Sequence, residues 1–209
     1  MYSCQKDSKP VVGEAVRCLQ AGGVLVYPTE TVYGLGGDPF HKDVVERIRA
    51  IKEREENKGF LLLIPTMSVL EGLVGEIPEV GQQLMERFWP GPLTFVLKGR
   101  SGLPSWLIGE DGTVALRVSS DPVVQAIVAM WGRPLISTSA NRSGYPPALS
   151  VERLDPAIAG AVDLVIDGGC RSCPHPSTIV DVSSGGVRMV RVGQVSAEEI
   201  EQIIGQGHG

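Results

Sequence analysis

Hydrophobic residues recur along this chain with two different spacings, and the spacing indicates which segments form helices and which form strands. Apolar residues three or four positions apart predict helices over residues 11–21, 44–51, 67–74, 79–88 and 122–131. Short uninterrupted apolar runs predict strands over residues 24–27, 60–64, 93–97, 114–118, 135–136, 163–166, 178–182 and 187–192. Because the predicted strands and helices alternate, we expect one α/β domain in which helices flank a mixed sheet.

Two local signals fix the starts of helices more closely. Asp121-Pro122 is typical of a helix start, because aspartate can cap the helix and proline suits its first turn. Ser196 with Glu199 forms a capping-box pattern, which predicts a last helix. We expect residues 205–209 beyond it to be frayed.

The composition bounds the class of protein. The chain has 209 residues, of which 43% are hydrophobic, so it can bury one substantial core. Its formal net charge of -5 argues against a general nucleic-acid-binding protein, because such proteins are more often basic. No apolar run approaches the roughly 20 residues that span a bilayer, and the N-terminus lacks the apolar segment of a secretory signal. We therefore expect a soluble cytoplasmic protein with no membrane partner.

Two polar segments stand out because each follows a predicted strand and ends in glycine. Residues 28–36 offer threonine hydroxyls and the carboxylate of Glu30, while residues 137–144 offer hydroxyls and the amide of Asn141. Polar groups at the end of a strand can bind a small polar ligand. The alternative is that both segments are ordinary turns. Ser139 is not expected to be a nucleophile, because no Gly-x-Ser-x-Gly sequence surrounds it.

Two groups of basic residues also need an explanation. Lys52 and Arg54 belong to a charged run that is typical of a solvated helix face with ion pairs three or four residues apart. Residues two apart share a face only on an extended chain, so both can bind one triphosphate only if the helix ends near Lys52. Arg117 lies near the end of a strand predicted to be buried, so its charge needs a partner. A structural salt bridge with Asp121 or Glu30 would supply one.

The cysteines do not indicate a disulfide framework, because Cys4, Cys18, Cys170 and Cys173 are irregularly spaced in a chain of this length. Cys170 and Cys173, with His175 nearby, resemble half of a zinc or redox motif. Structural zinc sites usually combine two such close pairs, and the other cysteines are far away in sequence. We therefore expect no metal site built from protein side chains.

Five separated motifs, taken in order, resemble the YrdC family, whose members make threonylcarbamoyl-adenylate for tRNA modification. The motifs are Pro28–Gly36, Lys52-x-Arg54 followed by Lys58, Thr113–Val118, Ser137–Gly144, and a Gly- and Pro-rich loop from Asp167 that leads into Ser177–Asp181, with Arg191 after it. The resemblance covers residues 10–195 and implies a single-domain YrdC-like twisted mixed sheet with a concave substrate cleft. We expect residues 196–209 to form a terminal helix and flexible tail, with no additional C-terminal domain.

The resemblance also implies an activity: a nucleotidyltransferase that joins L-threonine, bicarbonate and ATP into threonylcarbamoyl-AMP and releases pyrophosphate. The residues that match the family's threonine site are Thr31, Arg117, Ser137 and Ser177. Those that match its ATP site are Lys52, Arg54, Lys58, Thr113, Ser139, Asn141 and Arg191. Mg²⁺ is expected to enter with ATP. The sequence identifies no clear general base, for which Glu30 is a candidate, and Leu63 stands where many members have a histidine.

The family further implies two kinds of partner: the tRNA threonylcarbamoyltransferase complex that uses the product, and tRNA or double-stranded RNA itself. Two other functions stay open. One is an RNA-binding module for ribosome maturation, which the low aromatic content of 5% disfavours, because base stacking needs aromatic side chains. The other is a related enzyme that forms a carbamoyl-adenylate from a different substrate. For Arg191, the alternative is an exposed charge at a strand edge.

Overall fold

A computed structural model describes residues 2–3, 8–53, 59–109, 111–172 and 175–206 of the chain. Its α-helices are α1 (Ser8–Gln20), α2 (Lys42–Lys52), α3 (Glu79–Phe88), α4 (Pro122–Trp131), α5 (Pro156–Ala161) and α6 (Ala197–Gln206), and two 3₁₀ helices are Met67–Gly72 and Val151–Arg153. Its strands are β1 (Tyr2–Ser3), β2 (Leu25–Tyr27), β3 (Gly34–Gly36), β4 (Leu61–Leu63), β5 (Leu93–Lys98), β6 (Thr113–Arg117), β7 (Leu135–Ser139), β8 (Leu164–Asp167), β9 (Thr178–Asp181) and β10 (Arg188–Arg191).

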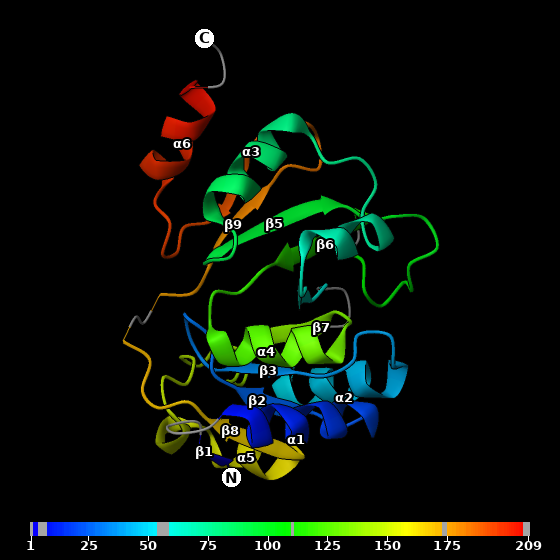
Figure 1. Cartoon of the computed structure of the whole chain (residues 1–209), viewed down its shortest axis with the longest axis vertical. Coiled ribbons are helices and arrows are strands. Elements are labelled where there is room, and N and C mark those ends of the chain that lie inside the picture. Colours follow the sequence, from blue (N-terminus) through cyan, green and yellow to red (C-terminus); the bar gives the residue numbers. More distant parts are fainter. Residues whose placement is uncertain (1, 4–7, 54–58, 110, 173–174, 207–209) are drawn as a thin grey trace.

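All of these strands belong to one sheet with the order β1-β8-β2-β3-β7-β4-β6-β5-β9-β10. The pairs β1/β8, β2/β8, β4/β6 and β5/β9 are parallel, and the other neighbours are antiparallel. In Figure 1, α3 and α6 lie in the upper part with β5 and β9, whereas α1, α2 and α5 lie in the lower part with β2, β3 and β8. The expected mixed sheet flanked by helices is confirmed.

Both predicted helix starts are confirmed by their hydrogen bonds. The Asp121 carboxylate accepts from the backbone N–H groups of Val123 (2.9 Å) and Val124 (3.2 Å), as expected of a residue that caps a helix. At α6, Ser196 N–H donates to Glu199 Oε2 (2.8 Å) and Glu199 N–H donates to Ser196 Oγ (3.2 Å). These two reciprocal bonds complete the capping box. The helix continues to residue 206, so its last two residues lie in the segment that we expected to be frayed.

The remaining predicted elements also form, but several boundaries and types differ. The segment predicted as a helix over residues 67–74 is a 3₁₀ helix. The strand predicted at residues 135–136 continues to residue 139, because its polar half pairs with β3 on one side and β4 on the other. The pattern of apolar residues predicted neither β3 nor α5. β3 lies inside the first polar segment, where the sequence analysis expected a connection rather than a strand.

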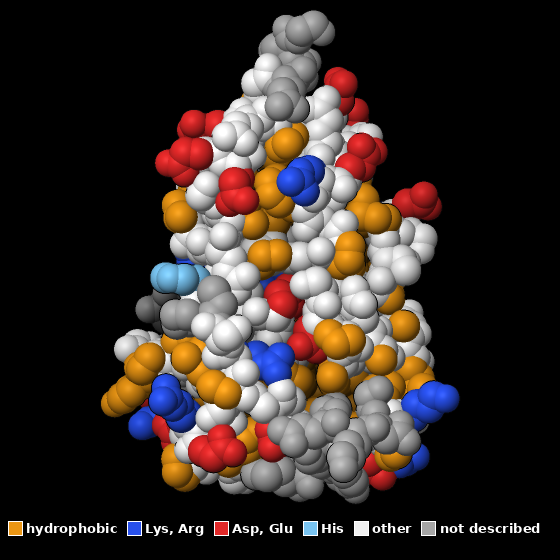
Figure 2. Space-filling view, turned by 60° about the vertical axis from the view of Figure 1, so that its left-hand side comes forward, with side chains coloured by type: hydrophobic (Ala, Val, Ile, Leu, Met, Phe, Trp, Pro, Cys, Tyr) orange, Lys and Arg blue, Asp and Glu red, His pale blue; other side chains and the backbone are white. Residues whose placement is uncertain are grey.

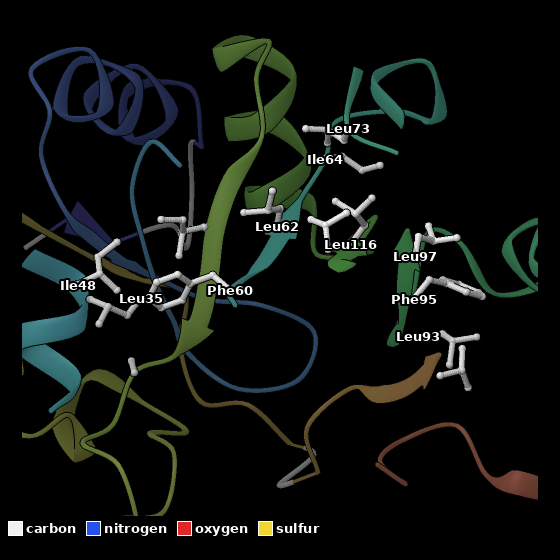
Figure 3. Close-up of a cluster of buried hydrophobic side chains, with 14 of the residues drawn as sticks. Leu35, Ile48, Phe60, Leu62, Ile64, Leu73, Leu93, Phe95, Leu97 and Leu116 are labelled. Atoms are coloured by element: carbon white, nitrogen blue, oxygen red, sulfur yellow. The ribbon is translucent and has the colours of Figure 1, made fainter. Parts of the chain in front are cut away.

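Neighbouring residues of the central strands point to opposite faces of the sheet, and each face has its own hydrophobic cluster. Leu62 of β4 and Leu116 of β6 lie with Phe95 in the larger cluster (Figure 3). On the opposite face, Leu63 and Leu135 pack in a second cluster with residues of α1 and α4. The second cluster covers only part of its face, and the uncovered part becomes important below. Within the described residues, no helix combines the length and the apolar character needed to cross a membrane.

Asp163 ties the start of β8 to two other elements, and this contact predicts a pH dependence of stability. Its Oδ2 accepts from the N–H of Val24 (2.7 Å) and from Arg47 Nη1 (2.6 Å). Burial opposes ionisation of this carboxylate, but the hydrogen bonds from Arg47 and Val24 outweigh burial and lower its pKa. A carboxylate with a lowered folded-state pKa adds stability above its unfolded pKa of about 3.9, and this stability is lost as the pH falls through the folded pKa.

We therefore expect Asp163→Asn to lower the free energy of unfolding at pH 7 and to have a much smaller effect at pH 3. Urea denaturation of both proteins at the two pH values measures the difference. A difference of equal size at both pH values would show that the charge of Asp163 is not the cause.

Candidate functional site

A cavity of about 590 Å³ opens on the sheet face that the second cluster leaves uncovered. The alternation of side chains along three neighbouring strands places Leu61 of β4, Ala115 and Arg117 of β6, and Ser137 and Ser139 of β7 on this face. The same face is therefore apolar where α1 and α4 cover it and polar where the cavity begins. The cavity is also lined by Thr29, Thr31, Lys52, Thr94, Asn141, Ser177 and Arg191, among others.

The first polar segment forms one wall of the cavity, and its two threonines are ordered by hydrogen bonds. Thr29 Oγ1 donates to the carbonyl of Val32 (2.6 Å) and lies 2.9 Å from Thr31 Oγ1. Because Thr29 has only one hydroxyl proton, the bond between the two hydroxyls is donated by Thr31. The Thr31 hydroxyl therefore presents only acceptor lone pairs to the cavity. A ligand that donates hydrogen bonds, such as an amine, suits this position.

Lys52 is the last residue of α2, which meets the condition that we set for shared phosphate binding by Lys52 and Arg54. Glu53 after it takes the left-handed conformation that ends the helix (φ 51°, ψ 43°). The Lys52 ammonium donates to the carbonyl oxygens of Ser139 (2.5 Å) and Asn141 (2.7 Å), so it also holds the second polar segment against α2. Arg54 and Lys58, predicted to bind ATP, lie outside the described residues.

Arg117 is 3% exposed, and its Nε lies 3.7 Å from Glu30 Oε1. Of the two salt-bridge partners that the sequence offered, the structure places Glu30 beside it, whereas Asp121 pairs with Arg171. The Nε of Arg117 and the Oε1 of Glu30 are buried and have no hydrogen-bond partner among the described residues. Arg117 lines the cavity and Glu30 does not, so the arginine faces a ligand and the carboxylate supports it from behind.

A second arginine enters the cavity from the end of β10. Arg191 donates from Nε (3.1 Å) and Nη2 (2.9 Å) to the carbonyl of Ser177, whose hydroxyl in turn lies 2.9 Å from Thr94 Oγ1. Burial lowers the pKa of Arg191, and the nearby positive charge of Arg117 lowers it further. Arg117 and Arg191 repel each other in one cavity, so an anion bound there would be attracted by both and would relieve their repulsion. Arg191 is exposed and lies on the edge strand β10, as the alternative expected, but it also lines the cavity.

The remaining predicted residues take different positions. Ser139 and Asn141 line the cavity, and the Asn141 amide donates to the carbonyls of Arg142 (2.9 Å) and Tyr145 (2.5 Å), which shapes the second polar segment. Thr113 lies on the same face of β6 as Ala115 but is not among the residues that line the cavity. Leu63, at the position of the family's histidine, is fully buried in the second cluster and does not reach the cavity.

The sequence analysis missed two residues that border this site. Thr94 faces the cavity from β5, in an apolar run whose pattern gave no hint of function. Arg171 lies in the loop of the fifth motif and binds Asp121 through Nη1 (3.0 Å), but the sequence analysis gave it no role. Burial raises the pKa of Asp121, although the N–H groups of α4 and the charge of Arg171 partly offset this effect.

Only part of the cysteine motif lies within the described residues. Cys170 is exposed, and Cys173 lies outside the described residues. In the part of the chain that is described, no group of three or more His, Cys, Asp or Glu side chains could hold a metal ion. Burial raises the pKa of the Cys18 thiol to about 11, so this cysteine is a thiol rather than a thiolate at neutral pH.

Comparison with known proteins finds similar sequences over most of this chain. The model of the Sua5_yciO_yrdC family, described as telomere recombination, matches residues 17–193. A threonylcarbamoyl-AMP synthase of Xanthomonas campestris pv. campestris is 39% identical over 181 residues, which are 85% of this chain and 96% of that protein.

Two solved structures share the fold. The crystal structure of P. abyssi Sua5 complexed with L-threonine superimposes with a TM-score of 0.90 at 32% identity, and the match covers 98% of this chain and 60% of that one. This chain therefore spans less than two thirds of Sua5. The crystal structure of E. coli YciO superimposes with a TM-score of 0.85 at 30% identity, covering 95% of this chain and 97% of that one.

Proposed function

This chain belongs to the Sua5_yciO_yrdC family, and on that premise we propose that it is a threonylcarbamoyl-AMP synthase that acts on L-threonine, bicarbonate and ATP. The resemblance to the YrdC family expected from its motifs is thereby confirmed. The observation that carries the proposed activity is the cavity itself, where the buried Arg117, a second arginine (Arg191) and a row of hydroxyls converge from separate motifs. Its relatives named threonylcarbamoyl-AMP synthase match it over nearly their whole length.

The side of the cavity around Arg117 is suited to an amino acid. A guanidinium can hold a carboxylate through two parallel hydrogen bonds, and Arg117 is buried at the cavity wall with Glu30 behind it. Thr31 presents acceptor lone pairs that can receive an ammonium or hydroxyl proton. Ser137 and Ser177 add hydroxyls that can bind the polar side chain of threonine. The bound L-threonine of the Sua5 structure supports this assignment.

Other residues of the cavity are suited to a nucleotide. Ser139 and Asn141 supply neutral polar groups and Lys52 supplies positive charge, and Arg191, which is bound to Ser177, adds a second cation. Arg54 and Lys58 would add two cations if they lie where the family motif places them, and Thr113 would extend the same wall. Mg²⁺ would arrive with ATP and neutralise phosphate charge.

The proposed chemistry needs little from the protein beyond position and charge. The amine of threonine attacks the carbon of bicarbonate, and water leaves to give a carbamate. A carbamate oxygen then attacks the α-phosphorus of ATP, the bond to the β-phosphate oxygen breaks, and pyrophosphate leaves. Arg117 would fix the amino acid, and Arg191 would stabilise negative charge that develops during the transfer. Glu30 is bound to Ser119 and faces Arg117, so its geometry favours support of Arg117 over proton transfer.

The downstream partners are part of the same proposal. The product would be used by the tRNA threonylcarbamoyltransferase complex in the cytoplasm. Direct binding of tRNA or double-stranded RNA would need a basic surface, and the described part of the face in Figure 2 mixes acidic and basic side chains instead. We therefore favour the enzyme over an RNA-binding module.

Release of pyrophosphate tests this function. The protein is given ATP and Mg²⁺ with threonine and bicarbonate together, and then with each omitted in turn. We expect release only when both are present. Release that does not need threonine but does need another carbamoyl donor would identify the related enzyme that forms a carbamoyl-adenylate from a different substrate. No release, together with RNA binding that weakens steeply with salt, would identify the RNA-binding module.

A further inference from the structure

Arg171 has no role in any motif considered above, yet its guanidinium joins three segments around the cavity. Nη1 donates to Asp121 Oδ2 (3.0 Å) and to the carbonyl of Thr29 (3.3 Å), and Nη2 donates to the carbonyl of Gly168. Its side chain is 19% exposed. Thr29 begins the first polar segment, and Asp121 caps α4 beyond the end of β6. One side chain thus holds together three connections that the sequence separates widely.

A continuous set of contacts leads from Arg171 to Arg117. The backbone N–H of Asp121 donates to Ser119 Oγ (3.2 Å), and this hydroxyl donates to Glu30 Oε2. The second oxygen of Glu30, Oε1, faces Arg117 Nε at 3.7 Å. Two acidic groups, Asp121 and Glu30, lie in the middle of this path, with Arg171 at one end and Arg117 at the other.

This arrangement of charges depends on Arg171 because the two carboxylates lie close enough to disfavour each other. The negative charge of Glu30 raises the pKa of Asp121 beyond the larger effect of burial, and the charge of Arg171 opposes both. Without Arg171, two buried carboxylates would compete for Arg117. The guanidinium of Arg117 would then be drawn toward the acids and away from the cavity.

The start of the loop that carries Arg171 is held firmly. Tyr33, at the end of the first polar segment, donates from its hydroxyl to the carbonyl of Gly169 (2.8 Å) and accepts from the N–H of Gly168 (3.0 Å). Its ring also lies 6.0 Å from the Arg171 guanidinium carbon. The position of Arg171 is therefore fixed by the same segment that forms the wall of the amino-acid side of the cavity.

We propose that Arg171 is a positioning residue for the amino-acid side of the cavity, which aligns Thr29–Thr31 directly and Arg117 through Asp121, Ser119 and Glu30. This inference rests on the proposed function, because it assumes that Arg117 binds the carboxylate of threonine. It assigns Arg171 no contact with either substrate. Nucleotide binding through Lys52, Ser139 and Asn141 should depend on it much less.

The test compares three variants in steady-state assays of pyrophosphate release. Arg171→Met removes the charge at similar length, and Arg171→Lys keeps the charge but loses the planar fork. Arg47→Met is the matched control, because Arg47 also bridges an aspartate, Asp163 (2.6 Å), and a backbone carbonyl, Ala161 (2.6 Å), but away from the cavity.

We expect Arg171→Met to raise the KM for threonine about tenfold, within the range by which members of one network couple, and to change the KM for ATP less than about twofold. Arg171→Lys should recover part of the loss, and Arg47→Met should leave both constants near those of the natural protein. Equal effects of Arg171→Met on both substrates, or an unchanged KM for threonine, would overturn the inference.

A second variant separates the effect of the Arg171 charge from simple anchoring of the loop. Asp121→Asn keeps an oxygen that can cap α4 but removes the charge. In the Arg171→Met background we expect Asp121→Asn to lower the KM for threonine about threefold, because the competing carboxylate is gone. Additive effects of the two substitutions would overturn the role of charge. A natural protein that releases no pyrophosphate would instead overturn the proposed function, and this inference with it.

Discussion

Replacing Arg117 with alanine is expected to abolish detectable threonine-dependent pyrophosphate release. Arg117 is the buried cation at the amino-acid group of the cavity, and Arg191, the other arginine among the described lining residues, is bound to Ser177. Removing one partner of a desolvated charged contact costs about 2–5 kcal/mol, and each 1.4 kcal/mol is about tenfold in affinity. We therefore expect kcat/KM for threonine to fall by a factor of about 30 to several thousand, the upper part of which leaves no detectable release.

The controls for this variant separate binding from folding. Arg117→Ala leaves Glu30 without its cation, so the variant is expected to be less stable. Adding Glu30→Gln should restore much of the stability, measured by urea denaturation, without restoring activity. Arg188→Ala also removes an arginine–aspartate pair, with Asp181, but its side chain is 71% exposed, and its activity should be unchanged. Substantial activity of folded Arg117→Ala protein would show that another group binds the carboxylate.

Gly36→Ala is expected to have the largest effect on stability among the substitutions considered. A Cβ at this position would lie 1.8 Å from the carbonyl oxygen of Ile136, so the backbone of β3 or β7 must move. Both strands carry walls of the cavity and pair directly with each other. Overpacking of a core typically costs 1–3 kcal/mol, and this contact is with backbone rather than a flexible side chain, so we expect about 3 kcal/mol.

Thermal unfolding measures this effect against a second glycine. For a protein of about this size, each kcal/mol shifts Tm by about 2–4 °C, so Gly36→Ala should lower Tm by about 6–12 °C. Gly160 lies in α5 with no atom within 4 Å of its would-be Cβ, and Gly160→Ala should be neutral or slightly stabilising. Equal Tm values for the two variants would contradict the close approach of β3 to β7.

The sequence predicted the elements whose local signals agree with their surroundings. Asp121-Pro122 and Ser196 with Glu199 start helices by hydrogen bonds that involve only neighbouring residues, so their pattern is sufficient. β3 has no such signal, because a Gly-Leu-Gly strand between polar residues shows no apolar period. It forms because Tyr27 of β2 lies against Gly34, where a Cβ would come within 2.8 Å of the tyrosine ring. Only the tertiary structure contains that reason.

The sequence predicted which residues belong to the candidate site better than it predicted their geometry. The motifs identified Thr31, Ser137 and Ser177 as members of one site, and the structure brings them to one cavity with Arg117. The pattern could not decide between Glu30 and Asp121 as the partner of Arg117, because that choice depends on where Arg171 lies. A single arginine in a loop carries no periodic or motif signal. Its role became visible only through its distances to three separate segments.

The measurement that tests the central claim most directly is the mass of the nucleotide product formed with isotopically labelled bicarbonate. Protein, ATP, Mg²⁺ and threonine are mixed with the labelled bicarbonate, and the nucleotides are analysed by mass spectrometry before the labile product decays. The account predicts an adenylate that carries threonine and the labelled carbon together and that is absent when either substrate is omitted. An adenylate without the label, or no adenylate from correctly folded protein, would contradict the account.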